Sequence, residues 1–188
     1  GYSEEWKAEA KKRGLPILNS SAEALEVLKD PKATAFLAET KVLTGEELMS
    51  RYHINVERYV KTLEIELTTL AEMARGLVIP TLEKQLTQLA AVTSGVESAA
   101  LKKAYSSRVK TIEDVFEKVL TSYDTLVGAL EKLHTFGDEA EKMKYINATL
   151  KPLSEALRAA CDSAEVEVAD ELWPLPKYRE MLFANTLS

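Results

Sequence analysis

The residues that most resemble a reactive site are Glu131 and His134, which stand in a Glu-x-x-His pattern. This spacing places a carboxylate and an imidazole on one helix face. Di-iron bundles use the pattern on two helices and add a glutamate from each of two others. The other of the 2 histidines, His53, has Ser50 three residues before it, so the pattern is not repeated. We therefore interpret His134 as a helix-end residue, stabilised by the negative end of the helix dipole.

The remaining candidates are weaker. Cys161 follows two alanines and has no histidine near it in sequence, which favours a small buried residue over a nucleophile. No two glycines are spaced for a phosphate-binding loop. Short basic clusters and the acidic residues of the first long helix are typical of solvated helix faces; these are Lys11–Arg13, Lys102–Lys103, Glu57, Glu64 and Glu66. The sequence predicts no catalytic, cofactor-binding or metal-binding residue in this chain.

The composition indicates an acidic helical protein that can fill a core. The 188 residues carry 24 Lys+Arg against 30 Asp+Glu, a net charge of −6, which argues against nucleic-acid binding. Apolar residues make up 46%, and 7 Gly with 6 Pro are few for a many-turned β protein. The single cysteine excludes an internal disulfide framework and suits a reducing compartment. Charges interrupt every apolar run and no leader is visible, so we expect a cytoplasmic protein that does not enter a membrane.

Residues 1–43 are predicted to form a collar of short helices. Ser3 can cap a first helix, and Ser20–Glu23 forms a capping box before a second. Asp30–Pro31 ends that helix and starts a third, since proline suits the first helical position. We expect the third helix to bury one face, made of Ala33, Phe36 and Leu37.

Residues 44–170 are predicted to form three long helices. The first begins at the capping box Thr44–Glu47 and ends near Gly95. Its apolar stripe has helical spacing: Leu48, Tyr52, Val56, Tyr59, Leu63, Leu67, Leu70, Ala74, Leu77, Leu82, Leu86 and Leu89. The second runs from about Glu97 to His134, and the third from Asp138 to about Ala169. Pro80 and Pro152 should each kink a helix without breaking it, and Gly76 leaves room for the first bend.

Helices of this length need partners along their whole extent in water. Because the connections near Gly95 and Gly137 are short, neighbouring helices should run antiparallel. We therefore predict an all-α fold, an elongated antiparallel three-helix bundle with the collar packed on one end. Collar, bundle and tail together form one structural domain.

Residues 171–188 are predicted to leave the bundle as an extended tail rich in tryptophan and proline. Each proline restricts the residue before it to extended conformations, so Trp173 and Leu175 should leave the helix. The apolar side chains of this tail are expected to dock on the bundle or on another surface of a larger assembly.

Three stretches resemble type III glutamine synthetases. Gly1–Trp6 with Lys12–Pro16 is similar to the segment just after the catalytic region of that family, and Glu171–Phe183 is similar to its extreme C-terminus. Matches to the first long C-terminal helix of the family lie between them: Glu47-Leu48, Arg51-Tyr52, Glu57, Tyr59, Lys61, Ile65, Glu66, Thr69 and Leu70. Residues 95–165 are similar only as heptad-like helix.

The resemblance implies that this chain corresponds to a C-terminal piece of a longer enzyme. That family joins ammonia to glutamate with ATP and Mg²⁺ or Mn²⁺, in ring-shaped homo-oligomers. Its metal and phosphate ligands lie upstream of the part matched here, so no catalytic residue carries over and we expect this chain alone to be inactive. The implied partners are the rest of the synthetase chain and its homo-oligomer, with no nucleic acid and no membrane. The alternatives are a free-standing helical interaction module and a metal-dependent oxidase bundle.

Overall fold

The computed structural model describes residues 3–183, apart from the side chains of residues 178 and 179. Throughout this range the regular elements are helices and no strand occurs, which confirms the predicted all-α class. Residues 1–2 and 184–188 lie outside the described range, and with them the end of the predicted tail. In residues 3–183 no helix is both long and apolar enough to cross a membrane.

The chain divides into two compact units. The first comprises Gly1–Leu63 with Phe136–Ala148, and the second comprises Glu64–Thr135 with Thr149–Ser188. This division follows contacts within the chain, so the three-part organisation into residues 1–43, 44–170 and 171–188 stays a prediction.

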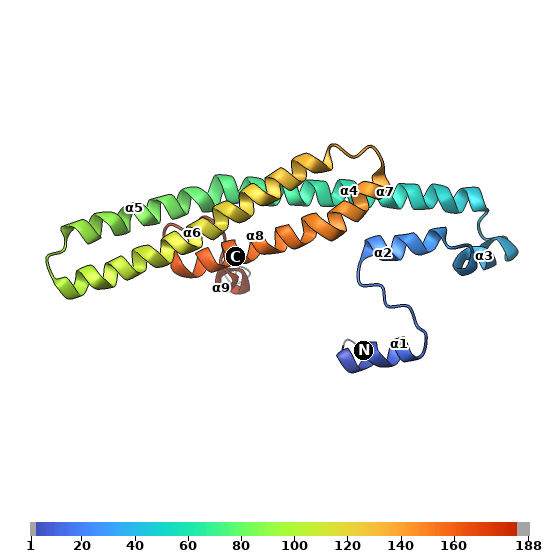
Figure 1. Cartoon of the computed structure of the whole chain (residues 1–188), viewed down its shortest axis with the longest axis horizontal. Coiled ribbons are helices and arrows are strands. Elements are labelled where there is room, and N and C mark those ends of the chain that lie inside the picture. The colour runs from blue at the N-terminus through green and yellow to red at the C-terminus, as the bar shows by residue number, and fades with distance from the viewer. Residues whose placement is uncertain (1–2, 184–188) are drawn as a thin grey trace. The chain divides into compact units, whose positions relative to one another are not determined.

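Short helices and the first part of a long helix make up the first unit (Figure 1). The predicted cap at Ser3 is present, since its side chain accepts from the Trp6 N–H. Asp30 also caps its helix, by accepting from the Lys32 N–H. Ser20 and Thr44 each form a reciprocal capping box with a glutamate three residues later. The elements are α1 (Glu4–Lys12), α2 (Ser21–Glu26), the 3₁₀ turn η1 (Val27–Lys29), α3 (Pro31–Glu39), the start of α4 (Gly45–Met73) and α7 (Glu139–Tyr145).

The buried face predicted for the third short helix is wrong. Phe36 is 57% exposed, Ala33 is exposed and Leu37 is half-buried, so α3 buries no residue. Within the first unit α3 contacts η1, the turn directly before it, and this contact leaves Ala33 and Phe36 exposed.

Longer helices pack together in the second unit. The helix of α4 continues through η2 (Ala74–Val78) into α5 (Ile79–Gly95), followed by α6 (Ala99–Leu133). After η3 (Ile146–Leu150) comes α8 (Lys151–Glu167). Helix α6 packs against both α5 and α8, and η2 contacts α6 and α8, so these segments enclose a common core (Figure 1). Its centre includes fully buried apolar side chains: Leu82, Val119, Leu126, Leu150 and Leu157.

A π-helical turn precedes each internal proline. Pro80 is the second residue of α5, directly after η2, and Pro152 is the second residue of α8, directly after η3. Proline lacks an N–H and its ring clashes with the carbonyl four residues earlier, whereas a π turn shifts the bonding to the fifth residue. The helices therefore run on through their prolines, and the distortion expected at each proline takes the form of a π turn.

The segment after α8 is attached to the second unit by polar and apolar contacts. The Ala169 N–H donates to Gln85 Oε1 at 2.9 Å, and Thr81 Oγ1 donates to the Leu172 carbonyl at 3.2 Å. The side chains of Gln85 and Thr81, both on α5, are each 4% exposed, and Trp173 is 8% exposed. Beyond Trp173 the chain forms a short helix, α9 (Tyr178–Phe183). The sequence predicted an extended segment here and not a helix.

Candidate functional site

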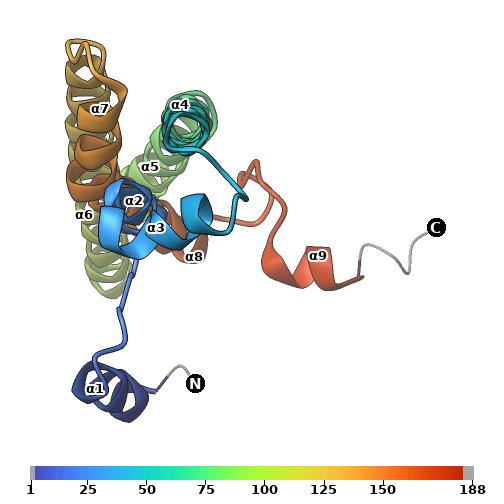
Figure 2. The same cartoon turned by 90° about the vertical axis from the view of Figure 1, so that its right-hand side faces the viewer.

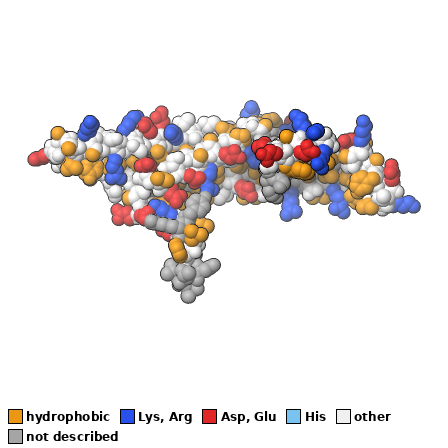
Figure 3. Space-filling view, turned by 90° about the horizontal axis from the view of Figure 1, so that it is seen from below, with side chains coloured by type: hydrophobic (Ala, Val, Ile, Leu, Met, Phe, Trp, Pro, Cys, Tyr) orange, Lys and Arg blue, Asp and Glu red, His pale blue; other side chains and the backbone are white. Residues whose placement is uncertain are grey.

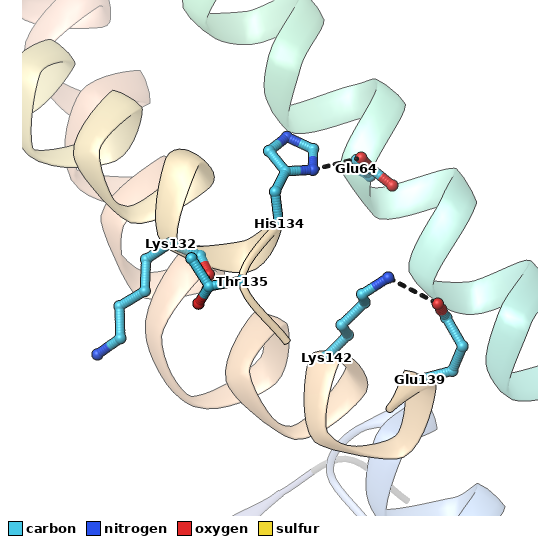
Figure 4. Close-up of polar contacts among 6 residues, drawn as sticks. All are labelled: Glu64, Lys132, His134, Thr135, Glu139 and Lys142. Carbon is cyan, nitrogen blue, oxygen red and sulfur yellow. Dashed lines mark hydrogen bonds and ion pairs between the residues drawn. The ribbon is translucent and has the colours of Figure 1, made fainter. Parts of the chain in front are cut away.

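The Glu-x-x-His pattern leads to a simple contact in the second unit. His134 caps the C-terminal end of α6 and turns toward Glu64 on α4, with 3.5 Å between Nδ1 and Oε1 (Figure 4). The His134 side chain is 66% exposed. Within residues 3–183, no three His, Cys, Asp or Glu side chains gather in a way that could hold a metal ion. The geometry matches a helix-end histidine beside a carboxylate.

The other residues considered from the sequence lie apart from any reactive cluster. Cys161 is buried, and burial raises the pKa of its thiol to about 11, so the thiol stays protonated at neutral pH and is a poor nucleophile. The ring of His53 meets that of Tyr52 edge-on at 5.3 Å. Arg13, at the end of α1, pairs with Glu9 at 2.8 Å. Lys102 and Lys103 are exposed near the start of α6, and Glu57 is exposed on α4.

A polar cluster ties α2 and η1 to α4 in the first unit. The Tyr52 hydroxyl donates to Glu26 Oε1 at 2.8 Å, and Lys29 Nζ lies 2.7 Å from Glu26 Oε2. Lys29 Nζ also lies 5.1 Å from the centre of the Tyr52 ring. The hydrogen bond from Lys29, followed by that from Tyr52, lowers the pKa of Glu26. These contacts fasten two segments, which is a structural role.

The first unit also contains an open hollow of about 550 Å³ between α2–η1 and α4. Leu25, Leu28, Tyr59 and Leu63 line it. The hydroxyl of Tyr59 is buried without a hydrogen-bond partner among the described residues, and burial raises the pKa of this tyrosine. No acidic or imidazole side chain lines the hollow.

A larger apolar groove lies within the second unit, and we call it the tail groove. It has a volume of about 570 Å³ and runs between the faces of α4–η2 and α8, with the segment after α8 as a third wall. Residues of all three segments line it, among them Leu70, Met73, Val78, Cys161, Trp173 and Leu175. Helical spacing explains this lining, since residues three, four or seven apart share a face.

Charged side chains lie at the margin of the tail groove. Three carboxylates line it: Glu66 and Asp162, which are exposed, and Glu165, which is half-buried. The positive side chain in the lining is Arg158, whose Nε lies 2.8 Å from Asp162 Oδ1. Three carboxylates and one guanidinium give this margin a net negative charge. The groove thus offers an apolar floor with an acidic rim, which suits binding of a surface more than a chemical step.

Exposed apolar residues adjoin the tail groove. Ile65 is 67% exposed on α4, and in α9 Met181, Leu182 and Phe183 are 62%, 78% and 62% exposed. Figure 2 shows α9 standing off from α6 and α8, and Figure 3 shows hydrophobic side chains on this part of the chain. The apolar tail was predicted as a docking segment, whereas Ile65 and Met73 lie outside the apolar stripe predicted for the first long helix. These two residues could have been found from the sequence, because apolar residues of the first long helix also occur outside the predicted stripe.

Comparison with known proteins places these features in a family. The family model described as glutamine synthetase C-terminal domain matches residues 1–97. A glutamine synthetase of Bacteroides fragilis is 29% identical over 193 residues, covering 98% of this chain. A type-3 glutamine synthetase of Dictyostelium discoideum is 30% identical over 190 residues, covering 97% of the chain. The glutamine synthetase of Butyrivibrio fibrisolvens is 30% identical over 198 residues.

The chain spans about a quarter of the length of these relatives. The matched part is 26% of the Bacteroides and Dictyostelium proteins and 27% of the Butyrivibrio protein. In each case nearly all of this chain is matched, so the similarity includes the bundle helices and the segment after α8.

Proposed function

The chain belongs to the glutamine synthetase C-terminal domain family, and we propose that it is the non-catalytic helical part of a type III synthetase polypeptide. In this proposal the rest of the polypeptide carries out the ATP- and metal-dependent ligation of ammonia to glutamate. The helical part serves architecture or contacts between subunits of a cytoplasmic homo-oligomer.

One observation carries the proposal: almost the whole chain is similar to only a quarter of each relative. The chemistry of the described residues agrees with it. Cys161 has a thiol pKa of about 11, and the polar clusters around Glu26 and His134 join helices to one another. The described residues of both units present exposed apolar side chains.

The test is a glutamine-formation assay on the purified chain with glutamate, ammonia, ATP and Mg²⁺. We expect no turnover above the rate without protein, with the Bacteroides fragilis synthetase as the positive control in the same buffer. Glutamine formed by pure material, in proportion to chain concentration and absent after heat unfolding, would overturn the proposal.

A free-standing interaction module is the second candidate, favoured by the exposed apolar residues of α3 and α9. The two candidates differ in what the tagged chain retains from a lysate of its source cells. Full-length synthetase subunits identified by mass spectrometry support the first candidate. A single unrelated protein that binds the purified chain directly, with no synthetase present, contradicts it.

A further inference from the structure

We propose that the tail groove and the exposed face of α9 form the surface on which the preceding catalytic region of the same synthetase polypeptide docks. This inference rests on the proposed function and adds to it where the contact lies and what chemistry it has. The occupant is a surface with an apolar centre and a rim of Lys or Arg side chains.

The tail groove has one wall held in place and an open apolar floor. Trp173 anchors one wall, held by the hydrogen bonds of Ala169 to Gln85 and of Thr81 to Leu172. The floor is apolar, yet it stays open over a volume of about 570 Å³. Because this wall is already held in place, little conformational entropy is lost when a second surface covers the apolar floor.

A run of exposed apolar side chains in α9 continues from the tail groove. Met181 lines the groove, while Leu182 and Phe183 continue from it and are 78% and 62% exposed. Single exposed apolar residues are common on soluble proteins, but a cluster that extends an apolar groove indicates a contact surface. Covering Ile65 and these two side chains would remove three large apolar groups from water at once.

The length of the relatives and the charge of the groove together favour one occupant. About three quarters of each relative lies outside the part matched here, and the family is a C-terminal domain, so in those proteins a large region precedes it. A region joined to the domain by the chain itself meets the groove at a high effective concentration. The net negative rim, with Glu66, Asp162 and Glu165 against Arg158, favours a basic surface on that region.

The experiment compares hydrogen–deuterium exchange in the full-length synthetase that carries this domain with exchange in the domain alone. We expect the backbone amides of α9 and of the α4–η2 wall to exchange about tenfold or more slowly in the full-length protein, because docking must open before they exchange. Leu182→Asp should abolish this difference. The matched control is Leu101→Asp on α6, a residue 49% exposed and outside the groove, which should preserve it.

A photo-crosslinking residue at position 182 of the full-length protein identifies the occupant directly. We expect cross-linked peptides from the region that precedes this domain. Equal exchange rates in the full-length protein and in the domain alone would overturn the inference, as would cross-links only to position 182 or the groove of a second copy. Either result leaves the proposed function standing, because that proposal depends on the glutamine assay.

Discussion

The side chain of Gln85 on α5 accepts a hydrogen bond from the backbone N–H of Ala169, 84 residues later, at 2.9 Å. Gln85 is 4% exposed, so its amide lies inside the second unit and fixes the point at which the chain leaves α8. Apolar packing alone would let the segment after α8 shift along α5. The hydrogen bond fixes its position, because it pairs this backbone N–H with a buried side-chain acceptor.

Replacement of Gln85 by leucine should destabilise the chain. Gln85→Leu keeps the volume but leaves the Ala169 N–H without its acceptor, so the free energy of unfolding should fall by about 1–2 kcal/mol. Urea unfolding followed by circular dichroism measures this. Gln88→Leu, at an exposed position of the same helix, should stay within about 0.5 kcal/mol of the parent. Equal losses in the two variants would contradict the role assigned to Gln85.

Trp173 should tolerate phenylalanine much better than alanine. Its ring is 8% exposed, but its indole N–H is buried without a hydrogen-bond partner among the described residues. Trp173→Ala removes the ring and should cost about 3–5 kcal/mol. Trp173→Phe keeps most of the ring and removes an unsatisfied donor, so it should lie within about 1.5 kcal/mol of the parent. Thermal unfolding of the three proteins decides; a phenylalanine variant as unstable as the alanine variant would mean that the N–H is paired.

The sequence predicted the helices well because their signals are local. The predicted caps at Ser3, Ser20 and Thr44 are present, and the first long helix extends to Gly95 as expected. A cap depends on residues two or three positions apart, so neighbours in sequence contain all the information. The starts of these capped helices and the all-α class therefore followed from the residues alone, whereas α9 did not.

The buried face was harder to predict where the helix changes pitch. The stripe assigned Leu77 to the core, yet Leu77 is 37% exposed and Val78 is 2% exposed. The π turn at Ala74–Val78 adds a residue to one turn and rotates every later side chain about the helix axis. Gln85 was missed for another reason, since its partner is at Ala169 and no local pattern marks a contact of that range. The tail groove combines both difficulties, because three segments distant in sequence form it.

Replacement of Gly128 by alanine should stabilise the chain. Gly128 is an exposed interior position of α6, before its last turn, and a Cβ built there meets no atom within 4 Å. Alanine lowers the entropy lost on folding, so Gly128→Ala should raise the free energy of unfolding by about 0.5–1 kcal/mol. Gly14→Ala is the contrasting control, since Gly14 has φ +73° and alanine there should lower stability by about 1 kcal/mol. A loss of stability in Gly128→Ala would show that this position needs glycine.

The thiol of Cys161 should react slowly in the folded chain and should make stability fall at high pH. Burial raises its pKa from 9.0 to about 11. Between these values the unfolded chain loses the thiol proton and the folded chain keeps it, so raising the pH favours unfolding. Thiol labelling at pH 8 should be slow until denaturant is added. Cys161→Ala should show a smaller fall in unfolding free energy between pH 8.5 and 10.5 than the parent, and identical pH profiles would contradict the assignment.

The Tyr52–Glu26 contact should matter at neutral pH and much less in acid. Tyr52→Phe removes the hydroxyl that donates to Glu26 Oε1 at 2.8 Å, so at pH 7 the free energy of unfolding should fall by about 0.5–1.5 kcal/mol. The hydrogen bonds from Lys29 and Tyr52 lower the pKa of Glu26, so the stability contributed by its ionised form is present above the ordinary carboxyl pKa. It is lost as the pH falls through the lowered value, where protonation of Glu26 weakens the hydrogen bond from Tyr52 that only the parent makes. Urea unfolding at pH 7 and pH 3 should therefore show a smaller difference between parent and variant at the lower pH, and a constant difference would place the effect outside the Glu26 contact. Tyr105→Phe, at a half-buried tyrosine of α6, is the matched control and should be nearly neutral at both values.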